Sequence, residues 1–370
     1  MRVWGMWAAF CTLAAAAPAL GQQVLLTESF DTDNGQWTTM GGAGKVTVVK
    51  DATQAKVGTG ALRYDYTVRK GEPTFLLHPI TSPPPESVKG FRFWVKTDAP
   101  TWLALILQER GGPRYTAAFQ TLGGAYQQVE IGLGDFGPGL DKDDPKDPNN
   151  KLDIAEVEGL GFLDMAVMLA EDGSGQLLKL IGLKDGARTL WLDEIEVLTA
   201  LSPETTKAAE NEVVVDGPSK PCMGWLVTGW AKPSIVSGPP LGARSLKLDY
   251  KRNAGELAGM IRFLPKGKLD GTTALALKAA SIQATTLLVQ VEEVSGGKYN
   301  ALVELGAGSQ VKDTSIPWAE FTADGESKDD NGKLDLAQVK QLVILDAGGM
   351  TGDGLANTLW IGPVRASKAK

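Results

Sequence analysis

The side chains that most often perform enzyme chemistry are scarce in this sequence of 370 residues. It contains one histidine, His78, and two cysteines, Cys11 and Cys222, far from it in sequence. Histidine-dependent triads and multi-histidine zinc sites need several such groups together. Acidic residues are numerous, but their spacing selects no pair for glycoside hydrolysis. The sequence therefore predicts a protein that is not an enzyme.

A second set of residues is suited to binding rather than to catalysis. In "FRFWVKT", apolar residues alternate with Arg92, Trp94 and a lysine, so a strand buries one set and exposes the other. We expect Gln108, Arg114 and Tyr115 to join Arg92 and Trp94 from neighbouring strands. Aromatic rings stack on the C–H faces of sugars, and planar polar groups bind hydroxyls. The alternative is that Trp94 belongs to the core, on a strand buried on both faces.

The segments that carry these residues have the pattern of β-strands. Short alternating or apolar runs lie at 91–97, 101–108, 114–119 and 126–131, separated by Gly, Pro and Asp at intervals of roughly 8–12 residues. Only "LDIAEV" suggests a turn or two of helix. Strands without crossover helices indicate an all-β fold, an antiparallel β-sandwich of jelly-roll type.

The sequence repeats itself at the scale of a domain. Tyr299 follows Tyr115 by 184 residues (299 − 115), and "SLKLDY" follows "ALRYDY" at the same offset. Further along, "NNKLDIAEVEGLGFLD" resembles "DNGKLDLAQVKQLVILD", and "TLWLDEIEV" resembles "TLWIGPVRA". Ordered matches of this kind are typical of a tandem repeat. We therefore predict two tandem sandwiches, at residues 22–200 and 221–366, joined by a polar linker at 201–220.

Residues 1–21 have the composition of a secretory signal peptide. Arg2 is followed by an apolar stretch and then by small residues before a cleavage site after Gly21. A membrane anchor is the alternative, but the stretch is near the lower length limit for spanning and lacks a basic flank. We therefore expect an exported protein, periplasmic or extracellular, whose mature chain does not insert into a membrane. Without Cys11, Cys222 has no partner for an intramolecular disulfide.

The charge balance limits the class of partner. Lysine and arginine number 37 against 44 aspartates and glutamates, for a net charge of −7. An acidic surface without a basic patch argues against nucleic acid and against anionic membranes as partners.

Several segments resemble one group of domains. "ESFD" near the start, "GTGALRYDY", "GFRFWVKT", "YQQVEIGLGDF" and the closing "LWLDEIEV" are similar to galactose-binding-like jelly-roll domains. These are the carbohydrate-binding modules of the family-11 type and the complex I intermediate-associated domains. The resemblance covers most of both copies, although no single motif is diagnostic. It implies a β-sandwich that binds glycans.

The resemblance also implies a structural calcium ion that joins the opening strand to the closing strand. The matching acids are Glu28 and Asp193, and backbone carbonyls complete such a site. The second copy has no acid in its opening segment, and Gly362 replaces Asp193, so we expect calcium in the first domain only. The alternative is that Glu28 and Asp193 are exposed acids on edge strands.

The acidic loops invite a second calcium interpretation, but their spacing argues against it. "DKDDPKDPNNKL" places Pro145 at the fifth position of an EF-hand pattern and has no glutamate at the twelfth. We expect the aspartates and asparagines of these loops to bind local backbone groups in turns.

These patterns predict a secreted, non-catalytic protein with tandem carbohydrate-binding-module-like domains, which binds a polysaccharide or glycan through domain 1. The alternative is a structural or adaptor protein of the cell envelope that uses its sandwiches to contact another protein. An open face lined by Trp94, Arg92 and Tyr115 favours the first hypothesis, and covered sheets with these residues buried favour the second.

Overall fold

A computed structural model describes most of the chain. The described residues are 24–368 without 34, 42–43, 70–71, 73, 140–144, 170–181, 204–205, 219–223, 229–230, 255, 330 and 349–351. The predicted signal peptide, Cys222 and parts of the predicted linker lie outside them.

The first sandwich consists of two antiparallel sheets of six strands each. Sheet A has the order β3 (Lys45–Val49), β4 (Ala61–Val68), β12 (Gly186–Leu198), β6 (Gly90–Thr97) and β9 (Gln127–Gly132), and β1 (Val24–Glu28) pairs with β12. Sheet B has the order β10 (Gly137–Pro138), β8 (Arg114–Thr121), β7 (Thr101–Glu109), β11 (Val157–Asp164), β5 (Phe75–Pro79) and β2 (Thr38–Met40). The short helix α1 (Met165–Leu169) follows β11, and "LDIAEV" contains a single 3₁₀ turn.

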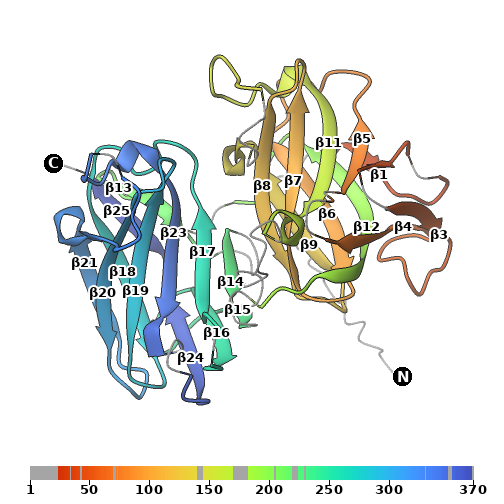
Figure 1. Cartoon of the computed structure of the whole chain (residues 1–370). Helices are drawn as coiled ribbons and strands as arrows, with labels where there is room; N and C mark the ends of the chain where they lie inside the picture. The colour runs from red at the N-terminus through yellow and green to blue at the C-terminus, as the bar shows by residue number, and fades with distance from the viewer. Residues whose placement is uncertain are drawn as a thin grey trace, which may run out of the picture.

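The second sandwich repeats this arrangement (Figure 1). Sheet C has the order β13 (Glu212–Asp216), β25 (Val364–Lys368), β18 (Thr272–Ser281), β24 (Ala356–Ile361), β16 (Ser245–Lys251) and β15 (Lys232–Val236), and β21 (Lys312–Pro317) pairs with β18. Sheet D has the order β14 (Trp225–Thr228), β17 (Gly259–Phe263), β23 (Val339–Asp346), β19 (Thr285–Glu293), β20 (Lys298–Leu305) and β22 (Thr322–Ala323). The all-β prediction of two tandem antiparallel sandwiches is therefore confirmed.

The strand order identifies the equivalent elements of the two copies. Sheet D matches sheet B strand for strand, and β24 and β25 together take the place of β12. The break between them falls at the Gly-Pro of "TLWIGPVRA", because proline has no N–H for the ladder. Strand β13, the counterpart of β1, lies inside the segment that we expected to be a linker.

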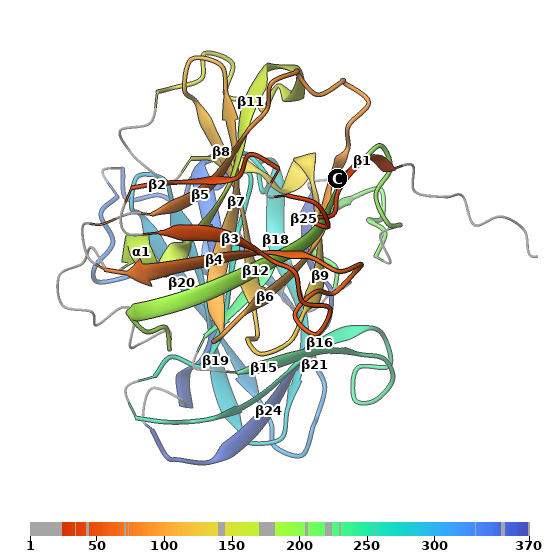
Figure 2. The same ribbon diagram turned by 90° about the vertical axis from the view of Figure 1, so that its right-hand side faces the viewer.

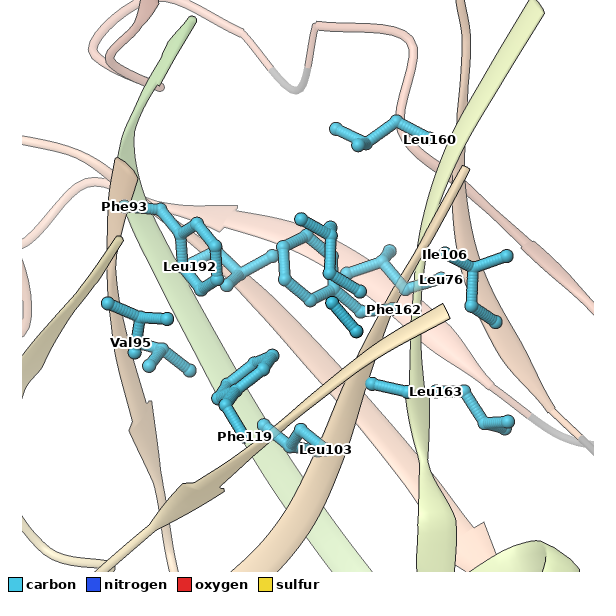
Figure 3. Packing of buried hydrophobic residues seen from close by; sticks show 14 of the residues in the cluster. Leu76, Phe93, Val95, Leu103, Ile106, Phe119, Leu160, Phe162, Leu163 and Leu192 are labelled. Carbon is cyan, nitrogen blue, oxygen red and sulfur yellow. The ribbon is translucent and has the colours of Figure 1, made fainter. Parts of the chain in front are cut away.

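Aromatic rings from both sheets fill the core of the first sandwich. Phe93 of sheet A contacts Phe162 and Phe119 of sheet B edge to face, with ring centroids 5.1 and 5.4 Å apart (Figure 3). All three side chains are almost completely buried. Such edge-to-face pairs stabilise a core beyond the burial of their area.

A buried carboxylate also joins the two sheets, and it explains why the repeated motif ends in aspartate. Asp164, at the end of β11, accepts hydrogen bonds from Tyr66 of sheet A at 2.6 Å and from Thr101 at 2.9 Å. In the second sandwich Asp346 accepts the same bond from Tyr250. The aspartate is thus a sheet-to-sheet tether in both copies.

The acidic loops form turns, as the sequence predicted. Asp147 accepts a hydrogen bond from the backbone N–H of Lys151 at 2.9 Å, and Asp329 does the same for Lys333. Asp147 also accepts a hydrogen bond from the hydroxyl of Tyr115.

The two sandwiches contact each other through an edge strand. In β14 the N–H of Val227 donates to the side-chain oxygen of Gln120 at 2.7 Å, and its carbonyl accepts from the Trp102 indole at 3.1 Å. Leu226, beside it, is fully buried and packs with the core cluster of the first sandwich. Gln120 and Trp102 lie on the outer face of sheet B, so this part of that face is covered by the second sandwich (Figure 1).

Gln120→Ala will remove the acceptor of a buried N–H. We expect it to lower the free energy of unfolding by about 1–3 kcal/mol in urea titrations. The matched control is Glu304→Ala, at the equivalent, exposed position of the second sandwich (304 − 120 = 184), where a change within about 0.5 kcal/mol is expected. Equal effects of the two variants would contradict a role for Gln120 in the contact.

Candidate functional site

The structure divides the five predicted binding residues between two sheets. Arg92 and Trp94 lie on β6, half-buried on the outer face of sheet A. Their strand neighbours Phe91, Phe93 and Val95 are buried in the core, so the predicted alternation is confirmed and Trp94 is not a core residue.

The other three residues belong to sheet B. Gln108 and Arg114 pair across β7 and β8. Tyr115 lies opposite the fully buried Leu107, is itself 3% exposed and binds Asp147. The expectation that these residues join Arg92 and Trp94 on one face is therefore wrong. The alternation of a strand assigns its side chains to inside or outside, but it does not say which of the two sheets the strand joins.

A row of alternating cations and aromatic rings crosses the outer face of sheet A. Trp191 of β12 lies opposite Arg63 of β4 on one side and opposite Lys96 of β6 on the other. The Lys96 ammonium lies 4.2 Å from the centroid of the Trp191 ring and 4.9 Å from that of Tyr126, just before β9. Arg63 contacts the Trp191 ring from the other side, at 5.7 Å. The sheet that carries this row faces the viewer in Figure 2, in front of the second sandwich.

Beside the row, the loop at 50–60 is fixed over Trp94. Asp193 of β12 accepts hydrogen bonds from the N–H groups of Lys56 and Val57, at 2.7 and 2.9 Å. The hydroxyl of Tyr126 donates to the carbonyl of Gln54 at 2.8 Å. These anchors place the Lys56 ammonium 4.5 Å from the Trp94 ring centroid.

A β-bulge shapes the strand beneath this loop. The pairing of β12 with β6 shifts between Asp193 and Glu196, and Glu194 has a left-handed φ of 47°. A bulge re-aims the side chains around it. Trp94 forms a hydrogen bond with the Glu194 carboxylate.

The arginines of this face are neutralised by nearby acids. Arg63 forms a bidentate ion pair with Asp65, with N–O distances of 2.9–3.0 Å. Arg92 forms an ion pair with Glu196 at 2.5 Å. Lys96 differs, because its pKa is lowered by burial alone, without a contribution from a carboxylate.

The second sandwich keeps only part of this arrangement. Trp360 takes the place of Trp191 and again lies opposite a cation, Lys247. Its neighbour on β18 is Ala280, in the position of Lys96, and Lys278 takes the position of Trp94.

The two acids predicted to hold calcium contact different segments. Glu28 accepts a hydrogen bond from the Trp37 indole at 3.1 Å and lies 3.9 Å from His78. Asp193 is completely buried beneath the 50–60 loop, which excludes the alternative that it is an exposed edge acid. One of its oxygens, Oδ1, has no hydrogen-bond partner in the described structure. An orphaned carboxylate oxygen is suited to a cation, whereas Glu28 is already engaged with Trp37.

Sequence reasoning missed Trp191 and Tyr126 as members of this face. Both residues stood in segments that the sequence comparison had singled out, but their approach to Lys96 depends on strand register. If "TLWLDEIEV" is treated as a strand whose side chains alternate between the core and the outer face, Trp191 falls on the outer face, as Trp94 does.

Among the described residues, no cluster of three or more histidine, cysteine or acidic side chains has the arrangement of a metal site. Over the same residues, no helix has the length and apolar character needed to cross a membrane.

The raised pKa of Glu28 leads to a prediction about how the stability of the fold depends on pH. Burial raises this pKa from 4.5 to about 7, although the hydrogen bond from Trp37 opposes the shift. Between these two values the folded state binds more protons than the unfolded state, so stability falls as the pH rises from about 4.5 to about 7. Glu28→Gln cannot ionise, and we expect it to remove this loss, which is on the order of 2 kcal/mol once solvent screening of the partly exposed carboxyl is allowed for.

Urea unfolding with EDTA at pH 5 and pH 8 measures the effect, and Glu158→Gln, an exposed acid on β11, is the control. If the free energy of unfolding of Glu28→Gln changes between pH 5 and pH 8 as much as that of the wild type, Glu28 does not titrate in this window.

No family model matches the sequence, and the search of curated proteins found no match. Solved structures similar to the chain include a family 11 carbohydrate-binding module from Clostridium thermocellum in complex with a β-1,3-1,4-mixed-linked tetrasaccharide. It is 16% identical, covers 44% of this chain and 98% of its own, and has a TM-score of 0.34. An exo-β-agarase is 11% identical over 44% of this chain and 25% of its own, with a TM-score of 0.33.

A structure with two modules covers nearly the whole chain. The tandem family 22 modules of Xyn10C from Paenibacillus barcinonensis are 15% identical over 96% of this chain and 100% of their own, with a TM-score of 0.32. Carbohydrate-binding modules of families 11 and 22 are thus among the structures to which this chain is similar.

Proposed function

We propose that the first sandwich binds a glycan through the outer face of sheet A, in an exported protein without catalytic activity of its own. The observation that carries this proposal is the aromatic and cationic row made by Arg63, Trp191, Lys96 and Tyr126, with Trp94 beside it. Rings on a sheet face and planar polar groups around them are the chemistry that binds sugars.

The position of this face supports the proposal. The outer face of sheet B is partly covered, because Trp102 and Gln120 hold the edge strand of the second sandwich. The face of sheet A carries no such contact among the described residues, and its three aromatic rings are half-buried rather than enclosed. The contact between the sandwiches therefore lies away from Trp94 and Trp191.

Trp94→Ala and Trp191→Ala test the proposal. Each removes an aromatic surface from the face. For any soluble polysaccharide that the wild type binds, we expect each variant to weaken binding by about 2 kcal/mol, roughly thirtyfold. Affinity gel electrophoresis across a panel of neutral and acidic polysaccharides gives the dissociation constants, and circular dichroism checks the fold.

Trp360→Ala is the matched control, because it removes a half-buried tryptophan from the equivalent strand of the second sandwich. Unchanged retention of both test variants on every positive polysaccharide would exclude this face. If Trp360→Ala alone weakens the binding of polysaccharide, the binding site belongs to the second sandwich.

The calcium prediction is retained as a proposal for the first sandwich, with Asp193 as its acidic ligand. The residue fits in one respect, because its buried Oδ1 has no hydrogen-bond partner in the described structure. When bound, the ion would supply positive charge that stabilises the 50–60 loop and closing strand.

Calorimetric titration of calcium into the EDTA-treated protein is expected to give one ion per chain. Asp193→Asn removes the charge and should abolish the heat signal, whereas Glu158→Gln should not. Binding that persists in Asp193→Asn, or two ions per chain, would contradict the assignment.

A further inference from the structure

Two lysines on the proposed binding face have aromatic rings as neighbours but no acid. Lys96 lies between Trp191 and Tyr126, and Lys56 lies over Trp94. No ion pair joins either ammonium group to a carboxylate in the part of the chain that the structure describes. Trp94 and Lys96 are two residues apart on one strand face, a separation of roughly 7 Å.

Three acids of the same face are engaged with other partners, and a fourth, Glu194, is bonded to Trp94. Asp65 binds Arg63, and Glu196 binds Arg92. Glu130 accepts two hydrogen bonds from Ser202, each 2.9 Å long. The positive charge of Lys96 and Lys56 is therefore not cancelled by an acid in contact with it, although the protein as a whole carries a net charge of −7.

The ammonium groups also affect how a sugar can approach the rings. A neutral sugar that stacks on Trp94 or Trp191 competes with Lys56 or Lys96 for ring surface. A sugar with a carboxylate or sulfate group can instead bind the ammonium groups while the rings contact its C–H faces. Lys96 is partly desolvated, so an anion recovers part of the energy that its burial costs.

We propose that this face takes an anionic polysaccharide, whose carboxylate or sulfate groups pair with Lys96 and Lys56. The inference rests on the proposed function and specifies the chemical class of its ligand. The second sandwich provides an internal comparison, because Ala280 stands where Lys96 does.

The experiment compares polysaccharides that differ only in charge. Isothermal titration calorimetry of the full chain is carried out with polygalacturonate and its fully methyl-esterified form, and with dextran sulfate and dextran. The first pair tests carboxylate and the second tests sulfate. We expect the wild type to bind a charged polymer at least tenfold more tightly than its neutral partner, and the difference to shrink at high ionic strength.

Lys96→Gln should weaken binding to the preferred charged polymer by about tenfold. Lys56→Gln, on an exposed loop where folding is not at risk, should weaken it as well. Lys278→Gln removes a half-buried lysine from sheet C and should leave the affinity unchanged. This control separates a specific contact from a general change in charge.

The outcomes distinguish this inference from the proposed function. Equal binding of charged and neutral polymers, with Trp191→Ala still harmful, would overturn the anionic ligand and leave the glycan-binding face in place. If Lys278→Gln and Lys96→Gln lower the affinity equally, the assignment of the anion contact to Lys96 and Lys56 is overturned. Failure of the wild type to bind any polysaccharide, charged or neutral, would overturn both proposals.

Discussion

Each sandwich depends on a buried carboxylate that holds its two sheets together. A buried charge is costly unless hydrogen bonds and opposite charge compensate it. Both copies place an aspartate at the end of the same strand and a tyrosine on the facing sheet, Tyr66 with Asp164 and Tyr250 with Asp346. The hydrogen bond fixes the position of one sheet relative to the other, and every cross-sheet ring contact in the core has to be compatible with it.

The two copies neutralise this carboxylate in different ways. Burial raises the pKa of Asp164, and Arg188 of β12 is the main opposing influence. Burial acts on Asp346 in the same direction, but hydrogen bonds from Thr285, Tyr250 and Arg252 hold its pKa below the usual value. Arg252 follows β16 and forms an ion pair with Asp346 at 3.0 Å. The cation thus comes from a different strand in each copy, while the aspartate and the tyrosine are kept.

The contact between the sandwiches decides which faces remain for a ligand. An edge strand exposes unpaired N–H and C=O groups that readily pair with other chains. Here Gln120 and Trp102 satisfy both groups of Val227, so the first sandwich protects the edge of the second. This protection uses part of the outer face of sheet B, and the candidate site lies on the other sheet, sheet A. The location of the candidate site is therefore partly a consequence of how the copies pack.

Much of the fold could be predicted from the sequence, because strand alternation and the repeat are local patterns. The alternation around Trp94 indicated an outward position but left open a core position, which the half-buried side chain excludes. The match of Tyr115 with Tyr299 followed from a constant offset. The role of Tyr115 did not follow, since it depends on an acidic loop that folds back onto the tyrosine hydroxyl. Likewise, the contact of Lys96 with Trp191 and Tyr126 depends on the register of three strands, which no single segment specifies.

The duplication separates residues that build the fold from residues that distinguish the copies. Trp191 and Trp360 have the same place in both sandwiches, and each stands opposite a cation on the neighbouring strand. The presence of the same residue in both copies is accounted for by packing within the sheet as well as by ligand binding.

Trp94 and Lys96 have no counterpart of the same type, because Lys278 and Ala280 occupy those positions. A difference in ligand between the copies must come from such unshared side chains. In the proposed function, specificity resides in Trp94, Lys96 and the loop that carries Lys56, and Trp191 supplies the aromatic surface beside them.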